Sequence, residues 1–188
     1  MVRFAANAAC VAVGLLLAAG VSVAQDDKIK VKVGDKFPNV ALRAAQVDKL
    51  DGKKAGDTVS VADLKGKAVI VFFYPRALTG GCTKESCGFR DLMKKDFPKD
   101  VVILGASNDG EAKQKEFIDT NMLPYPLLCD TDFKLIKELG IANAKTTAAQ
   151  RVTFVIDKEG KIAKIYTVGG KEIDAHPKDV LDFVKTLK

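Results

Sequence analysis

The sequence has one histidine, His176, among its 188 residues, and it has no tryptophan. No second histidine or cysteine lies near His176 at the spacing typical of metal ligands. The pattern therefore predicts neither a metal site nor a bound cofactor. We expect His176, which stands before Pro177 at the start of the last helix, to be a solvated loop residue.

Internal repeats and low-complexity segments are also missing, which argues against a solenoid and against a disordered tail. The formal net charge is +6, but the lysines are scattered among acidic residues. No basic stripe with interleaved aromatic residues is present. A solvated surface of mixed charge is therefore favoured over nucleic-acid binding.

Charge is scarce at the beginning of the chain, where Arg3 is the one charged residue in positions 1–24. An apolar run over 11–19 leads to Ser22-Val23-Ala24, small residues of the kind that a signal peptidase recognises. The pattern predicts a secretory signal peptide over 1–24 and an exported protein, periplasmic or secreted. A retained membrane anchor is the alternative, although the run is short for a span of about 20 residues.

Removal of this segment, which includes Cys10, would leave residues 25–188 as one domain without stable membrane association. Apolar patterns predict strands at 28–33, 68–74, 101–107, 125–129, 152–156 and 161–167, and helices at 82–97, 111–121, 132–139 and 178–187. The segment 38–61 reads as an irregular extension. Strands that alternate with helices, followed by a hairpin and a last helix, predict an α/β domain with a thioredoxin-like fold, a central mixed β-sheet flanked by helices.

One stretch, at 69–90, carries the candidate chemistry and reads VIVFFYPRALTGGCTKESCGFR. Its apolar start is typical of a strand buried on both faces, and Pro75 ends that strand. Gly80-Gly81 closes a short loop, after which Cys82 opens a helix. The N-terminus of a helix stabilises an anion, and for a cysteine that anion is the thiolate. We therefore predict that Cys82 is a reactive thiol.

A second cysteine, Cys87, follows on the same helix, and Cys129 brings the cysteines of the mature chain to an odd number. A structural disulfide between Cys82 and Cys87 is one interpretation for an exported protein. Five residues along an ideal helix separate Cα atoms by roughly 8–9 Å, whereas a disulfide needs about 4.4–6.8 Å. A bond that requires the helix to unwind suits a redox cycle better than a static link.

Pro75, Thr79 and Cys82 fit the pattern Pro-x-x-x-Thr/Ser-x-x-Cys, and in this the chain resembles the peroxiredoxins. The segment from Thr83 to Cys87 is similar to the bacterioferritin-comigratory, or Q-type, subgroup, in which the second cysteine follows the first by five residues. The resemblance extends from about Val33 to the C-terminus and implies the same thioredoxin-like fold.

The resemblance also implies a thiol-dependent peroxidase that acts on hydrogen peroxide or organic hydroperoxides. Cys82 would attack the peroxide and become a sulfenic acid, and Cys87 would resolve it as an intramolecular disulfide. A thioredoxin-like dithiol protein would reduce that disulfide. Thr79 would hold the reacting groups, Pro75 would shield the thiolate from water, and Arg151 would contact both thiolate and peroxide. Proteins of this subgroup are often monomers, and we expect a monomer.

Other residues near the motif have less specific roles. Glu85 would orient an arginine in the same network or be a solvated helix charge, and Arg90 is a weaker candidate. Cys129 ends an apolar strand and is interpreted as a small buried hydrophobe. The chain departs from related sequences at Arg76-Ala77-Leu78 and Gly80, and the apolar pair at 77–78 favours organic or lipid hydroperoxides.

Three other functions are open at this point. An exported disulfide oxidoreductase usually carries Cys-x-x-Cys, and a copper chaperone of the thioredoxin fold would use Cys-x-x-x-Cys with a distal histidine. The spacing of Cys82 and Cys87 fits neither pattern. A catalytically silent interaction domain is the third, and the combination of Thr79, Cys82 and Arg151 argues against it.

Overall fold

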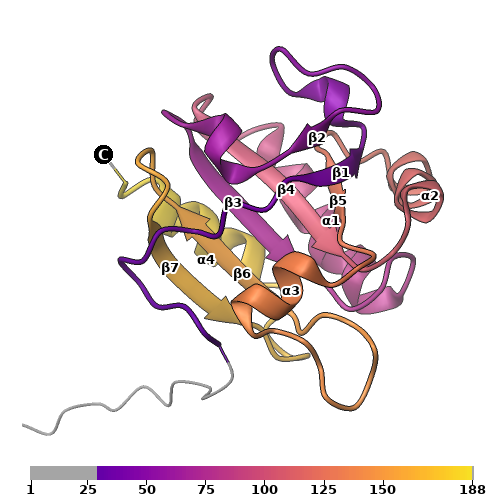
Figure 1. The fold of residues 1–188 in the computed structure, drawn as a ribbon. Helices are drawn as coiled ribbons and strands as arrows, with labels where there is room; N and C mark the ends of the chain where they lie inside the picture. The colour runs from indigo at the N-terminus through magenta and orange to yellow at the C-terminus, as the bar shows by residue number, and fades with distance from the viewer. Residues whose placement is uncertain (1–28, 188) are drawn as a thin grey trace, which may run out of the picture.

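The computed structural model describes residues 29–187, in which helices cover both faces of a seven-stranded sheet (Figure 1). The predicted signal peptide lies outside the described residues. The strands are β1 (Leu42–Ala45), β2 (Thr58–Val59), β3 (Ala68–Phe73), β4 (Val101–Ser107), β5 (Leu127–Cys129), β6 (Val152–Ile156) and β7 (Ile162–Thr167). The helices are η1 (Val47–Lys49), η2 (Val61–Leu64), α1 (Gly80–Met93), α2 (Glu111–Asn121), α3 (Lys134–Leu139) and α4 (His176–Val184).

The sheet is mixed, with the strand order β2-β1-β5-β4-β3-β6-β7. Strand β4 runs parallel to both β3 and β5, while β6 pairs with β3 in the antiparallel sense and β7 follows β6 as a hairpin. Strands β1 and β2 form an antiparallel edge beside β5. This arrangement confirms the predicted central mixed sheet flanked by helices.

Strand β3 lies inside the sheet, between β4 and β6, and all six of its residues are buried. Because successive side chains point to opposite faces, alternate residues enter two separate cores. Val69, Val71 and Phe73 pack in the core beneath α3 and η2. Ile70 and Phe72 pack in the core beneath α1, α2 and α4. The end of β3 is therefore held from both sides, which gives the loop that follows it a rigid base.

Helices α1 and α4 approach each other closely at Gly88. A Cβ atom on Gly88 would lie 2.7 Å from Cγ of Pro177, near the start of α4. Real Cβ atoms do not come that close, so only glycine permits this separation. The contact places the first residues of α4, including His176, against α1.

Two sequence-based predictions fail in the N-terminal third of the domain. The described part of the predicted edge strand, residues 29–33, has no strand conformation; a turn at Gly34 (φ 95°) follows, and Lys36 makes an isolated bridge to Lys161. The segment 38–61, interpreted as irregular, contains β1 and β2. These strands escape detection because they have four and two residues, and β1 carries alanines with low strand propensity.

Elsewhere the predicted boundaries are close to the observed ones. The ranges 101–107, 111–121 and 152–156 match β4, α2 and β6 without change. Helix α1 begins two residues earlier than predicted and ends at Met93 rather than at residue 97. Helix α4 likewise begins earlier, at His176. The long periodic segments are therefore the parts of the fold that the sequence predicts best.

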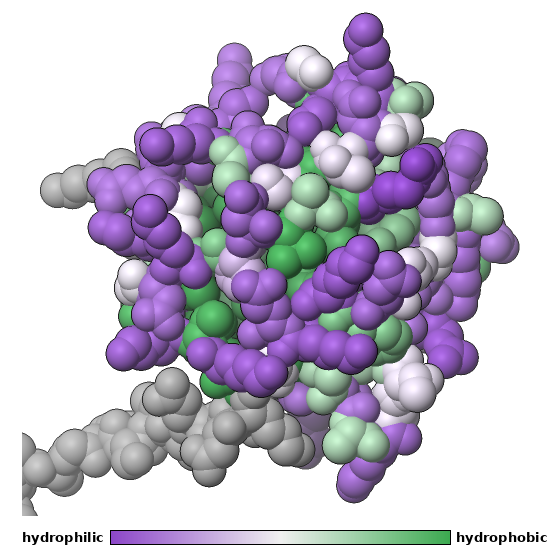
Figure 2. Space-filling view, in the orientation of Figure 1, coloured by the Kyte–Doolittle hydropathy of each residue, from purple (hydrophilic) through white to green (hydrophobic). Residues whose placement is uncertain are grey.

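Most of the face shown in Figure 2 consists of hydrophilic residues, with smaller hydrophobic areas between them. Exposed ion pairs, such as Lys84 with Asp174 and Lys115 with Asp119, are spread over several elements. Such pairs contribute little to stability. Within residues 29–187, no helix is long and apolar enough to cross a membrane.

Candidate active site

The site begins where β3 ends, in the loop that leads to α1. The N–H of Tyr74 still donates to the carbonyl of Ala106, so the backbone stays on the sheet up to Pro75. The N–H of Ala77 then donates to Oδ2 of Asp109, at 2.7 Å. This bond ties the loop to the segment after β4 and directs the chain into α1.

Cys82 is the third residue of α1 and is only 1% exposed. The first N–H groups of a helix have no partner within the helix, and the helix dipole places positive charge at this end. The N–H of Thr83 already donates to the carbonyl of Thr79 at 2.8 Å. The Cys82 sulfur thus lies at the positive end of a fourteen-residue helix, where a thiolate is stabilised.

Arg151 reaches this sulfur from the neighbouring strand. The antiparallel register pairs Phe73 with Val152, so Arg151 lies just before β6 at the edge where β3 ends. Nη2 of Arg151 donates to Sγ of Cys82 at 3.2 Å. The arginine side chain is 12% exposed, so its charge is poorly screened by water. The structure therefore brings together the two residues that the sequence predicted as nucleophile and cationic partner.

Glu85 lies one helical turn after Cys82, and its side chain is fully buried. Nη1 of Arg151 donates to Oε2 of Glu85, which forms a buried ion pair. Burial raises the pKa of Glu85 to about 7, although the neighbouring Arg151 acts in the opposite direction. The alternative interpretation of Glu85 as a solvated charge is wrong, and the orienting interpretation agrees with its position.

His176 is the clearest misprediction at the site. The predicted solvated residue is 3% exposed, and its ring packs edge-on against Phe89 and Tyr166. Nε2 lies 2.8 Å from Oγ1 of Thr153 and 3.7 Å from Oε1 of Glu85. Burial and, to a smaller extent, the charge of Arg151 lower the pKa of His176 to about 4, so the ring is neutral at neutral pH.

The hydroxyl group of Thr79 makes a hydrogen bond within its own loop. Oγ1 donates to the carbonyl of Arg76 at 3.0 Å, and the side chain does not cap the helix although Thr79 is the N-cap residue. Pro75 is half-buried directly after the strand. Both residues lie in the loop before Cys82 as predicted, while their catalytic roles stay predictions.

Leu78 forms an exposed apolar feature at the entrance to α1. It is 37% exposed and has a φ of 65°, a left-handed conformation that is uncommon for a bulky side chain. The adjacent Ala77 is buried, at 2% exposure. Of the two residues in the predicted apolar entrance, only Leu78 is therefore exposed.

Cys87 lies on a different side of α1 from Cys82, and neither forms a disulfide in the structure. Its thiol faces Oδ1 of Asn121 at the end of α2, at 3.8 Å. Arg90 donates from Nη1 to the carbonyl of Asn121 at 2.7 Å, and the hydroxyl of Tyr125 donates to the carbonyl of Ser86 at 2.7 Å. These three contacts, here called the α1 ties, stabilise the helical conformation of α1 near Cys87.

Asn121 and Tyr125 could not be recognised from the sequence, because their contacts to α1 depend on tertiary packing. Cys129, by contrast, is a buried thiol as predicted, at 8% exposure. Burial raises its pKa to about 11, so it stays protonated. In the described part of the chain, no group of three or more His, Cys, Asp or Glu residues could hold a metal.

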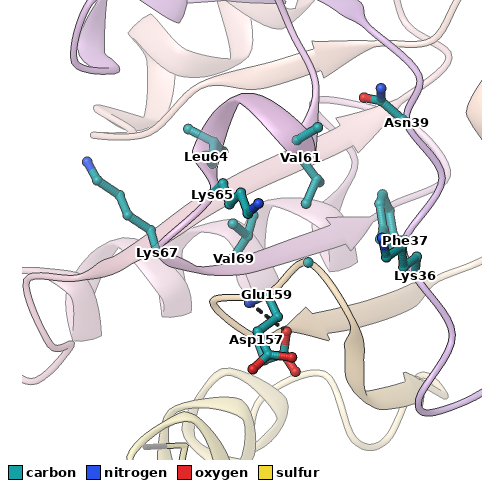
Figure 3. Close-up of a pocket in the computed structure, with 12 residues that line it drawn as sticks. Lys36, Phe37, Asn39, Val61, Leu64, Lys65, Lys67, Val69, Asp157 and Glu159 are labelled. Atoms are coloured by element: carbon teal, nitrogen blue, oxygen red, sulfur yellow. Dashed lines mark hydrogen bonds between the residues drawn. The ribbon is translucent and has the colours of Figure 1, made fainter.

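A hollow of about 290 Å³ lies at the other end of β3 (Figure 3). Its lining combines apolar residues with lysines and acids, namely Lys36, Phe37, Asn39, Val61, Ala62, Leu64, Lys65, Lys67, Val69, Asp157, Glu159 and Gly160. The acids belong to the turn between β6 and β7. None of the residues around Cys82 lines this hollow, so it does not contribute to the thiol site.

Comparison with known proteins agrees with this geometry. Residues 33–165 match the AhpC/TSA family, which is most of the domain that the structure describes. The chain therefore belongs to the AhpC/TSA family.

Named relatives narrow the class. Peroxiredoxin Bcp of Bacillus subtilis is 34% identical over 140 residues, which cover 71% of this chain and 83% of the relative. The chloroplastic peroxiredoxin Q of Oryza sativa is 38% identical over 138 residues, 73% of this chain and 59% of the relative. The crystal structure of peroxidoxin BcpB from Mycobacterium tuberculosis is similar with a TM-score of 0.71 and 30% identity, and the match covers 84% of this chain and 98% of that one.

Within the family the chain thus groups with the Bcp and Q peroxiredoxins, which are thiol-dependent peroxidases. This confirms both the predicted resemblance and the thioredoxin-like fold.

We predict that Arg151→Lys slows the reaction of Cys82 with peroxide. Lysine keeps the charge but lacks the planar fork that reaches Glu85 and Cys82 together, so we expect a loss of roughly tenfold or more in the second-order rate constant. Stopped-flow oxidation of the reduced protein measures it. In the control Arg43→Lys, which alters an exposed arginine beside Glu111, the rate should stay within about twofold. Equal rates for both variants would rule out a role for the guanidinium.

Proposed function

We propose that the protein reduces peroxides through Cys82 and resolves the product through Cys87. The Cys82 thiolate attacks one oxygen of the O–O bond, an S–O bond forms, and the other oxygen leaves as an alcohol or water after it takes up a proton. Cys82 becomes a sulfenic acid, which is a two-electron oxidation of sulfur, and the peroxide is reduced by the same two electrons.

The contact between Arg151 and Cys82 carries this proposal. A guanidinium 3.2 Å from the sulfur stabilises the thiolate, and its remaining N–H groups can bind the departing oxygen as negative charge develops there. The N-terminus of α1 adds a second source of positive potential at the same atom. A static structural disulfide has no need of either feature.

In the second half of the cycle, the Cys87 thiol condenses with the sulfenic acid. An S–S bond forms, the S–O bond breaks, and water leaves. Because both cysteines lie on α1, this step requires the helix to unwind between them. Unwinding breaks the α1 ties, the contacts that Cys87 and Arg90 make with Asn121 and the bond from Tyr125 to Ser86. A thioredoxin-like dithiol protein then reduces the disulfide and returns the helix to the observed state.

The cycle predicts different behaviour for two cysteine variants. Cys82→Ser should lose peroxide-dependent oxidation altogether, since the serine hydroxyl is not ionised. Cys87→Ser should react with one equivalent of peroxide at the wild-type rate and stop as a sulfenic acid, because no resolving thiol is present. Stopped-flow measurements with hydrogen peroxide and a lipid hydroperoxide, combined with trapping of the sulfenic acid, test both expectations.

The control is Cys129→Ser, which removes a thiol remote from the proposed cycle and should leave peroxide oxidation and disulfide formation unchanged. If Cys82 in the wild type reacts with either peroxide no faster than a free thiol does, the proposed function fails. Disulfide exchange or copper binding would then become the leading interpretation.

We also propose that the enzyme accepts organic hydroperoxides well. This proposal rests on Leu78, whose exposed side chain lies in the loop that leads to Cys82. An apolar group at the entrance gains contact with the alkyl part of a substrate, which hydrogen peroxide lacks.

Leu78→Asn is expected to lower the preference for cumene hydroperoxide over hydrogen peroxide by about three- to tenfold, since asparagine tolerates the same backbone conformation but is polar. The ratio of the two second-order rate constants for Cys82 oxidation measures this. Met122→Asn is a matched control, because Met122 is also exposed and has a φ of 50°. An unchanged ratio in Leu78→Asn would remove Leu78 from substrate selection.

A third proposal concerns location. The apolar run before Ser22-Val23-Ala24 supports export by the signal peptide, with peroxide reduction by a monomer outside the cytoplasm. In an expressing cell, N-terminal sequencing of the exported protein should begin at Gln25. A protein that keeps its first residues and stays with the membrane fraction would instead identify a retained anchor.

A further inference from the structure

A buried chain of polar side chains extends the site beyond Arg151. From Cys82 it passes through Arg151 to Glu85, and from Glu85 to His176 and Thr153. Arg151, directly before β6, and Thr153 in β6 are alternate residues of one extended segment, and such residues face the same side. The side chains of Glu85, Thr153 and His176 are all at least 97% buried, so water does not screen the interactions among them.

Only one of the two oxygens of the Glu85 carboxylate accepts a hydrogen bond. Oε2 accepts from Arg151, whereas Oε1 is buried and accepts no hydrogen bond from the described part of the chain. Nε2 of His176 lies 3.7 Å from Oε1. A buried carboxylate oxygen without a partner favours the protonated, neutral form of the acid.

The ionisation state of Glu85 determines the net charge of the site. When Cys82 and Glu85 are both ionised, one guanidinium serves two anions in a site with little water. Besides Arg151 and His176, Tyr125 lies near Glu85, and Glu172 and the ring of Tyr166 lie near His176. None of these further groups is a cation that could balance the second negative charge.

We propose that His176 is a positioning residue for the peroxidase reaction, whose imidazole favours the ionised form of Glu85 so that Glu85 holds Arg151 against the Cys82 sulfur. This inference rests on the proposed function.

The imidazole acts as a dipole rather than as a cation. Burial keeps the ring neutral, so one nitrogen carries a proton and the other a lone pair. A lone pair on Nε2 would repel the ionised Oε1, so we assign the proton to Nε2, where it lies between Oγ1 of Thr153 and Oε1 of Glu85. An N–H dipole in a dry interior stabilises a nearby anion even beyond hydrogen-bond distance.

The structure also explains how the ring keeps its position. It is packed between Phe89 of α1 and Tyr166 of β7, and Thr153 fixes its rotation through Nε2. The close contact of Gly88 with Pro177 sets the distance between α1 and the start of α4. The ring therefore has little freedom to move away from Glu85.

The test is the pH profile of Cys82 oxidation by hydrogen peroxide in His176→Phe. Since the pKa of Glu85 is raised to about 7, ionisation of Glu85 should make the wild-type rate rise with pH through neutrality. Phenylalanine keeps the ring packing but has no N–H, so the midpoint should move upward by about one pH unit. The rate should then fall about fivefold at pH 7 and stay within about twofold of wild type at pH 9.

Two further variants distinguish a positioning role of His176 from a general disruption of the structure. His176→Gln restores an N–H donor and should return the midpoint toward the wild-type value. Thr153→Val combined with His176→Phe removes both partners of their hydrogen bond, so neither of these two side chains is left with an unpaired polar atom, and folding should be preserved. It should show the same upward shift as His176→Phe. The thiolate absorbance of Cys82, followed in the same samples, separates its own ionisation from that of Glu85.

The inference is overturned if both phenylalanine variants keep the wild-type midpoint, or if their rates fall by the same factor at every pH. It is also overturned if the rate at pH 7 rises, which would mean that ionised Glu85 competes with the thiolate for Arg151. In each case a wild type that reacts rapidly leaves the proposed function intact. A wild type without rapid oxidation of Cys82 would contradict the proposed function itself.

Discussion

The guanidinium of Arg151 is the group on which the site depends. It contacts the Cys82 sulfur with one nitrogen and the buried carboxylate of Glu85 with another. A buried ion pair is costly to desolvate and repays that cost only when the geometry is good on both sides. The surrounding elements can therefore be understood by what they contribute to holding this one planar cation in place.

Three parts of the fold meet at that point. Strand β3 is anchored in two cores and directs its following loop to the N-terminus of α1. Strand β6 runs antiparallel beside it, which brings Arg151 to the edge where that helix begins. The first residues of helix α4 pack against α1, because Gly88 has no side chain that would hold Pro177 at a greater distance. The site thus brings together segments that are about 70 to 90 residues apart in the sequence.

How much of this the sequence predicts depends on whether a contact is local. Cys82 and its helix follow from a contiguous motif, and Arg151 was found through the family resemblance. The prediction for His176 is wrong because its burial depends on the packing of α4 against α1 and β7, and no local sequence pattern indicates that packing. Glu85 was ambiguous for a similar reason, because a charged residue on a helix looks the same whether it faces water or an arginine. Strands β1 and β2 were missed because short edge strands receive most of their stabilisation from their neighbours.

The α1 ties have a consequence for how the enzyme tolerates excess peroxide. In the proposed cycle, a newly formed sulfenic acid could not meet Cys87 while Tyr125 and Arg90 hold α1 in its helical conformation. During that interval a second peroxide molecule can carry the sulfur on to sulfinic acid, which a dithiol cannot reverse. The hydrogen bonds around Ser86 and Asn121 would therefore control the lifetime of the sulfenic acid. If Cys87 resolves the sulfenic acid as proposed, the combined strength of these bonds would also set the peroxide concentration at which the enzyme begins to be inactivated.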